Sequence, residues 1–343
     1  MKTFKNNLFD LLRLVAASFV LISHQFALSG KIEPHIGVSY TLGGIGVVIF
    51  FAISGYLVTA SFTRDPDLAR FFYRRALRIF PGLIVCLIFT VFLIGPIFSN
   101  LSVEEYFANS ATWEYFIHNA ILHTVYPLPR VFEHTFYPNS VNGSLWTLPI
   151  EFICYVILAI ALTLYNSYKS ILVILITCVM VCIFVLDGMI TSQSIWMTNA
   201  PFLFVAFLIG ALLNKTKNRW IKDRVLQNIL LLISFIFLFA YISRSEGKLI
   251  FPITLGVVVI IIGELFHSPK LIAKRDYSYG IYIYAFPIQQ IVINYTNFSF
   301  LSKTLICIII TLCLAMVSWH FVELPFLNLK PKASINVLSN DME

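Results

Sequence analysis

The chain has 343 residues, of which 59% are hydrophobic and only 12% are charged. Soluble domains are about 45–50% apolar and about 25% charged. This composition excludes a disordered chain and a nucleic-acid-binding domain, and it argues against a soluble enzyme, because too little polar surface is present to cover a core. The apolar stretches are continuous rather than alternating, which excludes a transmembrane β-barrel. The remaining class is an all-α, polytopic membrane protein.

Apolar stretches follow one another along the chain, and a membrane-spanning helix needs about 20 such residues. Ten spans are expected, at 8–28, 44–62, 79–98, 144–165, 170–187, 199–214, 225–242, 249–266, 277–296 and 304–323. The long loop 99–143 is polar and aromatic, and within it 103–124 is expected to form a surface helix. The expected organisation is a single transmembrane domain, 1–326, and a short cytoplasmic tail, 327–343.

The distribution of Lys and Arg predicts the orientation, because cytoplasmic loops of membrane proteins are enriched in these residues. With the N-terminus inside, the inner segments carry 18 of the 24 Lys and Arg residues and the outer segments carry five. Both termini are therefore expected in the cytoplasm and the loop 99–143 outside. A cleaved signal peptide ending near Ala27 is an alternative interpretation of the first span.

Three of the ionisable side chains within the spans stand out, because charge is costly there and indicates function. Arg13 and His24 are 11 residues apart, about three helical turns, so they project from one face about 16 Å apart. Glu151 lies about 10 Å below the outer end of its span, a depth compatible with that of His24. We therefore expect Glu151 to pair with His24 and orient it as a general base.

Structural roles are the alternatives for these residues: a snorkelling anchor for Arg13, a packing histidine for His24, and a purely structural pair with Glu151. Glu264 and Glu323 lie near the ends of spans. We expect both carboxylates to reach the membrane surface.

The densest basic cluster lies at 70–78. Arg70, Arg74 and Arg78 are spaced i, i+4 and i+8 and share one helix face, and Arg75 is one turn from Arg78. The guanidinium fork suits phosphate oxygens, so the cluster indicates a phosphate-bearing ligand. A positive-inside anchor that contacts lipid head groups is the alternative.

The second span combines glycines at 43–46 with Ser54, Gly55 and Tyr56 near its middle. Small residues allow a helix or a ligand to approach closely, and helix packing is the commoner reason for them. Ser54 lacks the surroundings of a nucleophile elbow. The six cysteines lie in apolar runs and show no metal-ligand or disulfide spacing, so no metal site is expected.

Six motifs in order resemble the membrane acyltransferase family 3, which contains bacterial sugar O-acetyltransferases. The motifs are Arg13-x10-His24, the stretch 43–57, Arg75-x-x-Arg78-Ile-Phe-Pro81, the stretch 142–155, the stretch 277–287 and the stretch 318–326. They cover nearly the whole chain. Ala285 occupies a position where many relatives carry His, which leaves His24 as the main candidate base.

The resemblance implies a stand-alone member in the bacterial inner membrane, without an appended extracytoplasmic domain or a bound cofactor. The donor would be cytoplasmic acyl-CoA, usually acetyl-CoA, and the acceptor a hydroxyl of a lipid-linked or polymeric cell-envelope carbohydrate. Arg75 and Arg78, with Arg74 and Arg13, would hold the CoA phosphates. Residues expected on the acceptor side are Ser144, Trp146 and Tyr282.

The expected reaction is O-acyl transfer, with His24 removing the proton of the acceptor hydroxyl as it attacks the thioester. An acyl-histidine relay is the alternative chemistry. A transporter of lipid-linked sugars or small metabolites is the alternative function, because polar residues on one face of a span also suit a transport path. A non-catalytic scaffold is a third class.

Overall fold

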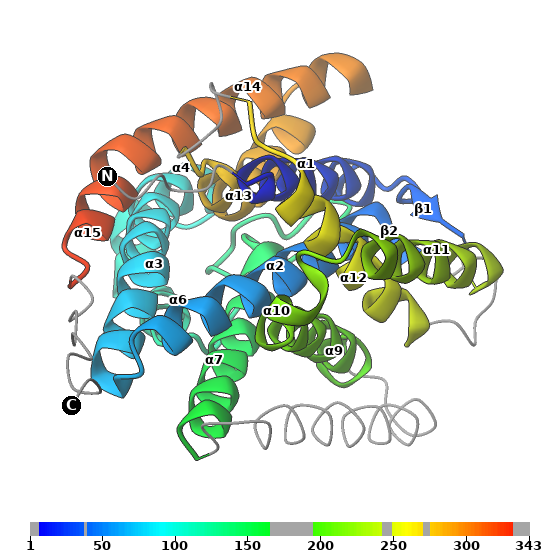
Figure 1. The fold of residues 1–343 in the computed structure, drawn as a ribbon. Helices are drawn as coiled ribbons and strands as arrows, with labels where there is room; N and C mark the ends of the chain where they lie inside the picture. Colours follow the sequence, from blue (N-terminus) through cyan, green and yellow to red (C-terminus); the bar gives the residue numbers. More distant parts are fainter. Residues whose placement is uncertain (1–6, 38–39, 165–194, 242–248, 270–274, 332–343) are drawn as a thin grey trace.

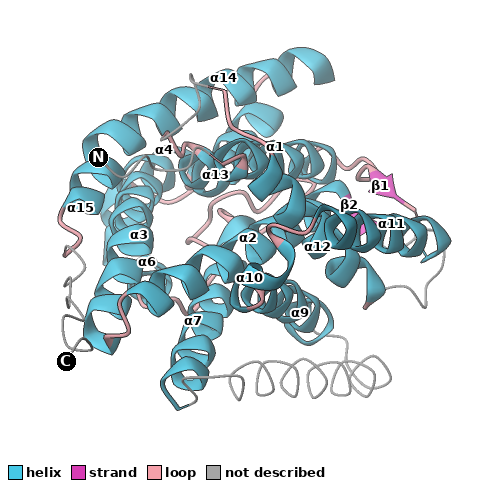
Figure 2. Ribbon diagram, in the orientation of Figure 1, coloured by secondary structure: helices cyan, strands magenta, loops and turns pink. Residues whose placement is uncertain are grey.

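The computed structural model describes residues 7–37, 40–164, 195–241, 249–269 and 275–331. These residues form a bundle of helices (Figure 1), which confirms the all-α class. In the described part of the chain, the strands are β1 (His35–Ile36) and β2 (Tyr40–Thr41), a short antiparallel pair between the first two helices (Figure 2).

The second helix lies at the centre of the bundle. Helix α2 (Leu42–Arg64) packs against α1 (Phe9–Leu28), α7 (Thr147–Leu164), α9 (Ile195–Lys215) and α12 (Ile250–Leu265). Its N-terminus is capped by Thr41 Oγ1, which accepts a 3.0 Å hydrogen bond from the Gly44 amide.

Glycines bring α2 and α9 into close contact. A Cβ atom at Gly55 would lie 1.9 Å from the Phe207 carbonyl oxygen, and one at Gly210 would lie 2.0 Å from the Ala52 carbonyl oxygen. Because larger residues would collide with the facing backbone, the role of Gly55 is helix packing.

The basic cluster belongs to one long helical segment rather than to a loop. Helix α3 (Leu68–Ile88) continues through a π-helix (Phe89–Ile94) into α4 (Gly95–Phe98), and the side chain of Asp67 caps its start. The apolar span therefore carries the arginines on its own first turns, which fixes their positions relative to the membrane-spanning part.

The expected surface helix of the long loop is present as two helices, α5 (Val103–Ala108) and α6 (Ser110–Ala120). They pack against the third span: the buried Tyr106 hydroxyl donates a 3.1 Å hydrogen bond to the Val91 carbonyl. A 3-10 helix (Gly143–Trp146) then leads into α7.

The second half of the chain completes the bundle with helices of different lengths. These are α10 (Lys217–Trp220), α11 (Arg224–Tyr241), α13 (Ser278–Tyr295), α14 (Phe300–Ser318), a π-helix (Trp319–Glu323) and α15 (Leu324–Asn328). Helix α13 is almost entirely buried and lies between α1 and α14 (Figure 1).

Six of the described helical segments are long and apolar enough to cross a membrane. They are Phe9–Leu28, Leu42–Arg64, Leu68–Phe98, Gly143–Thr163, Arg224–Tyr241 and Phe300–Asn328, and the shorter apolar helices are Asn199–Lys215 and Ile250–Leu265. The ninth expected span coincides with α13, and the span expected at 170–187 lies outside the described residues. The count of ten and the orientation stay predictions.

The expectation that Glu264 and Glu323 reach the membrane surface is wrong. Glu264 Oε1 accepts 2.8 Å hydrogen bonds from the Tyr56 hydroxyl and from Lys217 Nζ. Glu323 is 2% exposed and accepts a 3.1 Å hydrogen bond from Ser318 Oγ. Donors within the bundle bond one oxygen of each carboxylate, and both side chains are buried inside it.

Candidate active site

Two cavities lie inside the bundle. The first, of about 440 Å³, we call the arginine cavity; its charged lining residues are Arg13, Arg64, Arg74, Arg75, Arg78, Lys330, Glu151 and Asp276. The second, of about 650 Å³, we call the histidine cavity; its titratable and aromatic lining residues are His24, Glu33, Tyr40, Tyr126, Tyr137, Trp146, Phe202, Tyr282 and Phe286.

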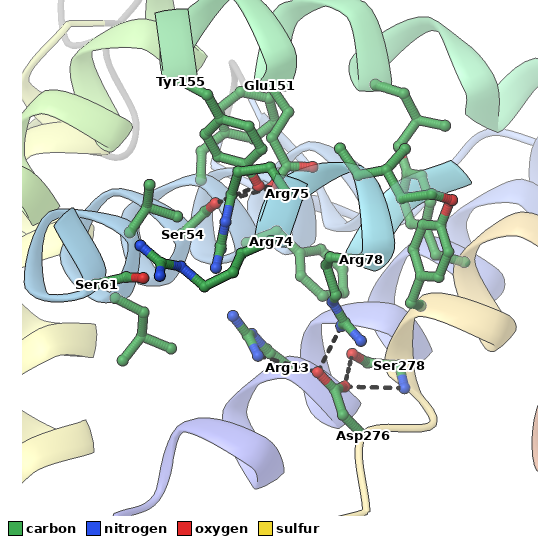
Figure 3. A pocket seen from close by; sticks show the side chains of 18 of the residues that line it. Arg13, Ser54, Ser61, Arg74, Arg75, Arg78, Glu151, Tyr155, Asp276 and Ser278 are labelled. Atoms are coloured by element: carbon green, nitrogen blue, oxygen red, sulfur yellow. Dashed lines mark hydrogen bonds and ion pairs between the residues drawn. The ribbon is translucent and has the colours of Figure 1, made fainter. Parts of the chain in front are cut away.

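Arginines from two helices meet in the arginine cavity around one carboxylate. Asp276 Oδ2 accepts hydrogen bonds from Arg78 Nη2 at 2.6 Å and from Arg13 Nη1 at 3.0 Å (Figure 3). Ser278 Oγ donates to the other carboxylate oxygen. Burial opposes ionisation, but the guanidinium groups of Arg78 and Arg13 lower the pKa of Asp276 to about 2. Asp276 therefore stays ionised and ties α1 to α3.

A second carboxylate holds Arg74 at the N-terminal end of the same helix. Asp65 lies between α2 and α3, and its Oδ2 is 2.5 Å from Arg74 Nη1. Arg70 Nη2 donates a 2.8 Å hydrogen bond to the other oxygen. The hydrogen bond from Arg74 lowers the pKa of Asp65. Much of the charge on these two arginines is thus balanced within the protein.

Arg75 differs from its neighbours in the cluster. Within the described residues it makes no ion pair, whereas Arg70, Arg74 and Arg78 each pair with a carboxylate. Its guanidinium carbon lies 5.9 Å from the centre of the Tyr155 ring. A buried, unpaired guanidinium is costly, so Arg75 is the best placed of the cluster to bind an anion.

Glu151 faces the arginines from α7. Its Oε1 accepts hydrogen bonds from Ser54 Oγ at 2.8 Å and from the Tyr155 hydroxyl at 2.5 Å. Figure 3 shows Ser54, Glu151 and Tyr155 on one side of the arginine side chains and Asp276 on the other. The carboxylate therefore belongs to the arginine cavity.

His24 lies in the other cavity. Its Nδ1 is buried and has no hydrogen-bond partner in the described part of the chain, and its ring contacts the Phe286 ring edge to face at 5.1 Å. Because His24 lines the cavity, Nε2 is the nitrogen available to a ligand there. The expected pairing with Glu151 is wrong, since the Glu151 carboxylate is bound by Ser54 and Tyr155.

The two cavities share part of their walls. Val47 and Tyr282 line both of them. The Tyr282 hydroxyl and Thr147 Oγ1 are 2.7 Å apart, and the Tyr282 ring packs edge to face against Phe50 at 5.7 Å. Val47 and Tyr282 therefore form a wall that the two cavities have in common.

The remaining expected site residues divide between the cavities and the packing. Trp146 lines the histidine cavity and Ser54 the arginine cavity, whereas Tyr282 lines both. Tyr56 lines neither and bonds Glu264 within the core. Ser144 is buried, and its hydroxyl has no partner in the described residues.

Three charged residues that line the cavities were not predicted from the sequence. Asp276 and Lys330 line the arginine cavity and Glu33 lines the histidine cavity. All three lie outside the expected spans. The criterion used to find candidates, an ionisable side chain within a membrane span, therefore did not apply to them. Burial and the nearby arginines, Arg75 first, lower the pKa of Lys330 to about 7.

The described residues contain no group of three or more His, Cys, Asp or Glu side chains that could hold a metal ion. Cys86, Cys154, Cys307 and Cys313 are free thiols. Cys178 and Cys182 lie outside the described residues.

Comparison with known proteins connects this geometry to a family. A family model described as an acyltransferase domain matches residues 6–320. The chain is 36% identical to the O-acetyl transferase of Shigella phage Sf6, over 97% of this chain and 99% of that protein. It is 27% identical to nodulation protein 10 of Rhizobium leguminosarum bv. viciae, over 95% and 94%.

A third relative is longer than this chain. The peptidoglycan O-acetyltransferase OatA of Listeria monocytogenes is 25% identical, over 87% of this chain and 54% of that protein. No solved structure matches. Because the family model covers nearly the whole chain, this multi-pass membrane protein belongs to the acyltransferase family.

Proposed function

We propose that the protein is an O-acyltransferase that moves an acyl group, most simply acetyl, from acyl-CoA in the arginine cavity to a carbohydrate hydroxyl in the histidine cavity. The observation that carries this proposal is the pair of cavities that meet at Val47 and Tyr282, one strongly cationic and the other containing His24. We place the protein in the bacterial inner membrane, with the arginine cavity on the cytoplasmic side.

The arginine cavity suits a CoA donor because CoA carries phosphates. Six cationic and two carboxylate side chains line it. Asp276 fixes Arg13 and Arg78, and Asp65 fixes Arg74. Arginines fixed in this way are preorganised for phosphate oxygens, so less side-chain entropy is lost on binding. Arg75 supplies charge that no carboxylate of the described chain balances by an ion pair.

The histidine cavity suits the acceptor. His24 Nε2 removes the proton from the acceptor hydroxyl as the hydroxyl oxygen attacks the thioester carbonyl. The carbon–sulfur bond then breaks, and the CoA thiolate takes up the proton held by the imidazolium. The products are an ester and free CoA, so the reaction needs no further cofactor.

Glu151 has a positioning role in this scheme. It accepts hydrogen bonds from the Ser54 and Tyr155 hydroxyls, and Arg75 lies over the Tyr155 ring. We assign Glu151 to the donor site, where it orients these groups near the shared wall. It does not act by orienting His24.

The test uses purified protein in lipid vesicles with acetyl-CoA labelled in the acetyl group and a cell-envelope glycan extract. We expect wild type to release CoA and label the glycan. His24→Gln should abolish labelling while donor binding remains, and Arg130→Ala, in the outer loop, should behave like wild type. Donor binding can be measured separately by equilibrium dialysis with labelled acetyl-CoA.

The outcomes separate the alternatives. A wild-type protein that neither binds acetyl-CoA nor releases CoA with the extract would overturn the proposal and favour transport. A labelled protein trapped after incubation with donor alone, and absent in His24→Gln, would show an acyl-histidine relay instead of direct transfer.

A further inference from the structure

The lining of the histidine cavity differs from that of the arginine cavity in charge. None of the described residues lining it is Lys or Arg, and Glu33 is its carboxylate. Aromatic rings and amide or hydroxyl groups make up much of the rest; these are Tyr126, Tyr137, Trp146, Asn139, Asn199 and Thr41. Rings that combine an apolar face with a polar tip, next to amides, suit a hydroxyl-rich ring such as a sugar.

Glu33 is held in place by α1. Ser23 Oγ donates a hydrogen bond to Glu33 Oε2, and Ser23 directly precedes His24 in the helix. Ser23 is itself fully buried, because it packs against Gly43, where a Cβ atom would lie 2.9 Å from that of Ser23. A substitution at Gly43 would therefore displace the residue that holds Glu33.

The other oxygen of Glu33 is available. Among the described residues, the hydrogen bond from Ser23 is the one that Glu33 accepts through its side chain, and it uses Oε2. Oε1 is not among the buried atoms that lack a partner. Glu33 and His24 line the same cavity, so a ligand in that cavity can contact both side chains.

We infer that Glu33 is an acceptor-binding residue that accepts a hydrogen bond from a sugar hydroxyl and makes the site selective for an uncharged sugar over one carrying a carboxylate. The inference rests on the proposed function and deepens it. The Glu33 carboxylate accepts hydrogen bonds from hydroxyl groups and disfavours a second carboxylate beside it, and in the described lining no Lys or Arg offsets that repulsion. Specificity would thus come as much from repulsion of a sugar carboxylate as from the hydrogen bond with a sugar hydroxyl.

The test compares acceptors that differ in charge alone. The primary hydroxyls of the envelope-glycan extract are oxidised to carboxylates, and half of this material is converted to methyl esters. Both samples lack the same hydroxyl, so a difference between them reports charge. Label transfer from acetyl-CoA is measured with wild type, Glu33→Gln, Ser23→Ala and the control Glu133→Gln, a partly buried loop carboxylate that pairs with Arg130 away from this cavity.

We expect wild type and Glu133→Gln to label the ester about tenfold faster than the acid, equivalent to about 1.4 kcal/mol. Glu33→Gln should bring the two rates within about threefold and raise the KM for the ester, with the KM for acetyl-CoA unchanged. For Ser23→Ala, the ratio of the ester rate to the acid rate should lie between those of wild type and Glu33→Gln, because this substitution removes the hydrogen bond to Glu33 without removing the carboxylate.

Equal wild-type rates with acid and ester, or an unchanged ratio in Glu33→Gln, would overturn the inference and leave the proposed function standing. Failure of wild type to release CoA with the untreated extract would overturn the proposed function itself. Acetyl-CoA binding by Glu33→Gln, measured in parallel, shows that the variant is folded.

Discussion

The arginine cavity and the histidine cavity share a wall but differ in the charge of the side chains that line them. In the first, Asp65 and Asp276 each hold two arginines, so cationic groups are fixed before any ligand arrives. In the second, the imidazole of His24 has a buried Nδ1 without a partner, and Glu33 is bonded through one oxygen. Recognition of an anion requires a charge network, whereas recognition of a hydroxyl requires a few polar atoms and an apolar lining.

The network that fixes the arginine cavity gives the largest expected effect. Asp276→Asn removes the charge that Arg13 and Arg78 share, which leaves two partly buried cations close together, with Glu323 at 3.6 Å as the remaining carboxylate partner of Arg78. We expect unfolding to become easier by about 3–5 kcal/mol and acetyl-CoA binding to weaken. Thermal unfolding in detergent and equilibrium dialysis measure the two effects. Exposed Glu114→Gln is the control, and an unchanged unfolding temperature for Asp276→Asn would contradict this role.

Arg75 tests ligand binding in the same cavity, because it makes no ion pair in the described chain, unlike Arg70, Arg74 and Arg78. Arg75→Ala should weaken acetyl-CoA binding about 10–100-fold, as expected for loss of charged hydrogen bonds worth about 1.5–3 kcal/mol. Arg75→Lys should recover part of the loss, since it keeps the charge but not the planar fork. The KM for the acceptor should not change in either variant. An equal rise in the KM for both substrates would refute the division between the cavities.

Lys330 should make donor binding depend on pH. Burial and the surrounding arginines lower its pKa from 10.5 to about 7, so its positive charge is present below pH 7 and is lost above it. We expect acetyl-CoA to bind about threefold to fivefold more weakly at pH 8.5 than at pH 6, since one such contact is worth up to about 1 kcal/mol. Lys330→Met should flatten this dependence.

The same group affects stability in the opposite direction. Between its pKa of about 7 in the folded protein and its ordinary value of 10.5, the unfolded chain binds more protons. The free energy of unfolding therefore rises with pH over this range, and Lys330→Met should reduce that slope. A slope that is the same in wild type and Lys330→Met would show that another group is responsible.

The smallest effect is expected at the shared wall. Tyr282→Phe removes the 2.7 Å hydrogen bond to Thr147, and a neutral hydrogen bond is worth about 0.5–1.5 kcal/mol. Acyl transfer should slow by less than about tenfold, with both KM values unchanged. Tyr106→Phe, which loses a buried hydroxyl bond away from both cavities, is the matched control. A loss above about a hundredfold would place the Tyr282 hydroxyl in the chemistry itself.

Hydrophobicity and helical spacing predicted much of the fold. The apolar runs identified the long helices, and the i, i+4, i+8 spacing placed Arg74 and Arg78 on one face of α3, where both line the arginine cavity. The common face of Arg13 and His24 was also informative, because each lines a cavity. These are local properties of a helix, so the sequence contains them.

The contacts between distant elements could not be predicted in the same way. The positions of Glu151 and His24 along their helices predicted a similar depth in the membrane. Depth alone does not determine toward which neighbouring helix a side chain points. Asp276, which joins Arg13 and Arg78, is 263 residues from Arg13 and lies just before α13. Glu33 is in a polar loop, where a carboxylate is unremarkable until the loop folds back on Ser23.

The wall formed by Val47 and Tyr282 has an electrical consequence for the proposed reaction. Moving one elementary charge through the membrane potential requires about 2.3 kcal/mol per 100 mV. An acetyl group is uncharged, so it passes these side chains without electrical work, while the phosphates of its carrier stay among the arginines. In the proposed reaction the acetyl group passes to the acceptor as one proton passes from the acceptor hydroxyl to the CoA thiolate, so acetyl and hydrogen are exchanged and no net charge crosses the wall.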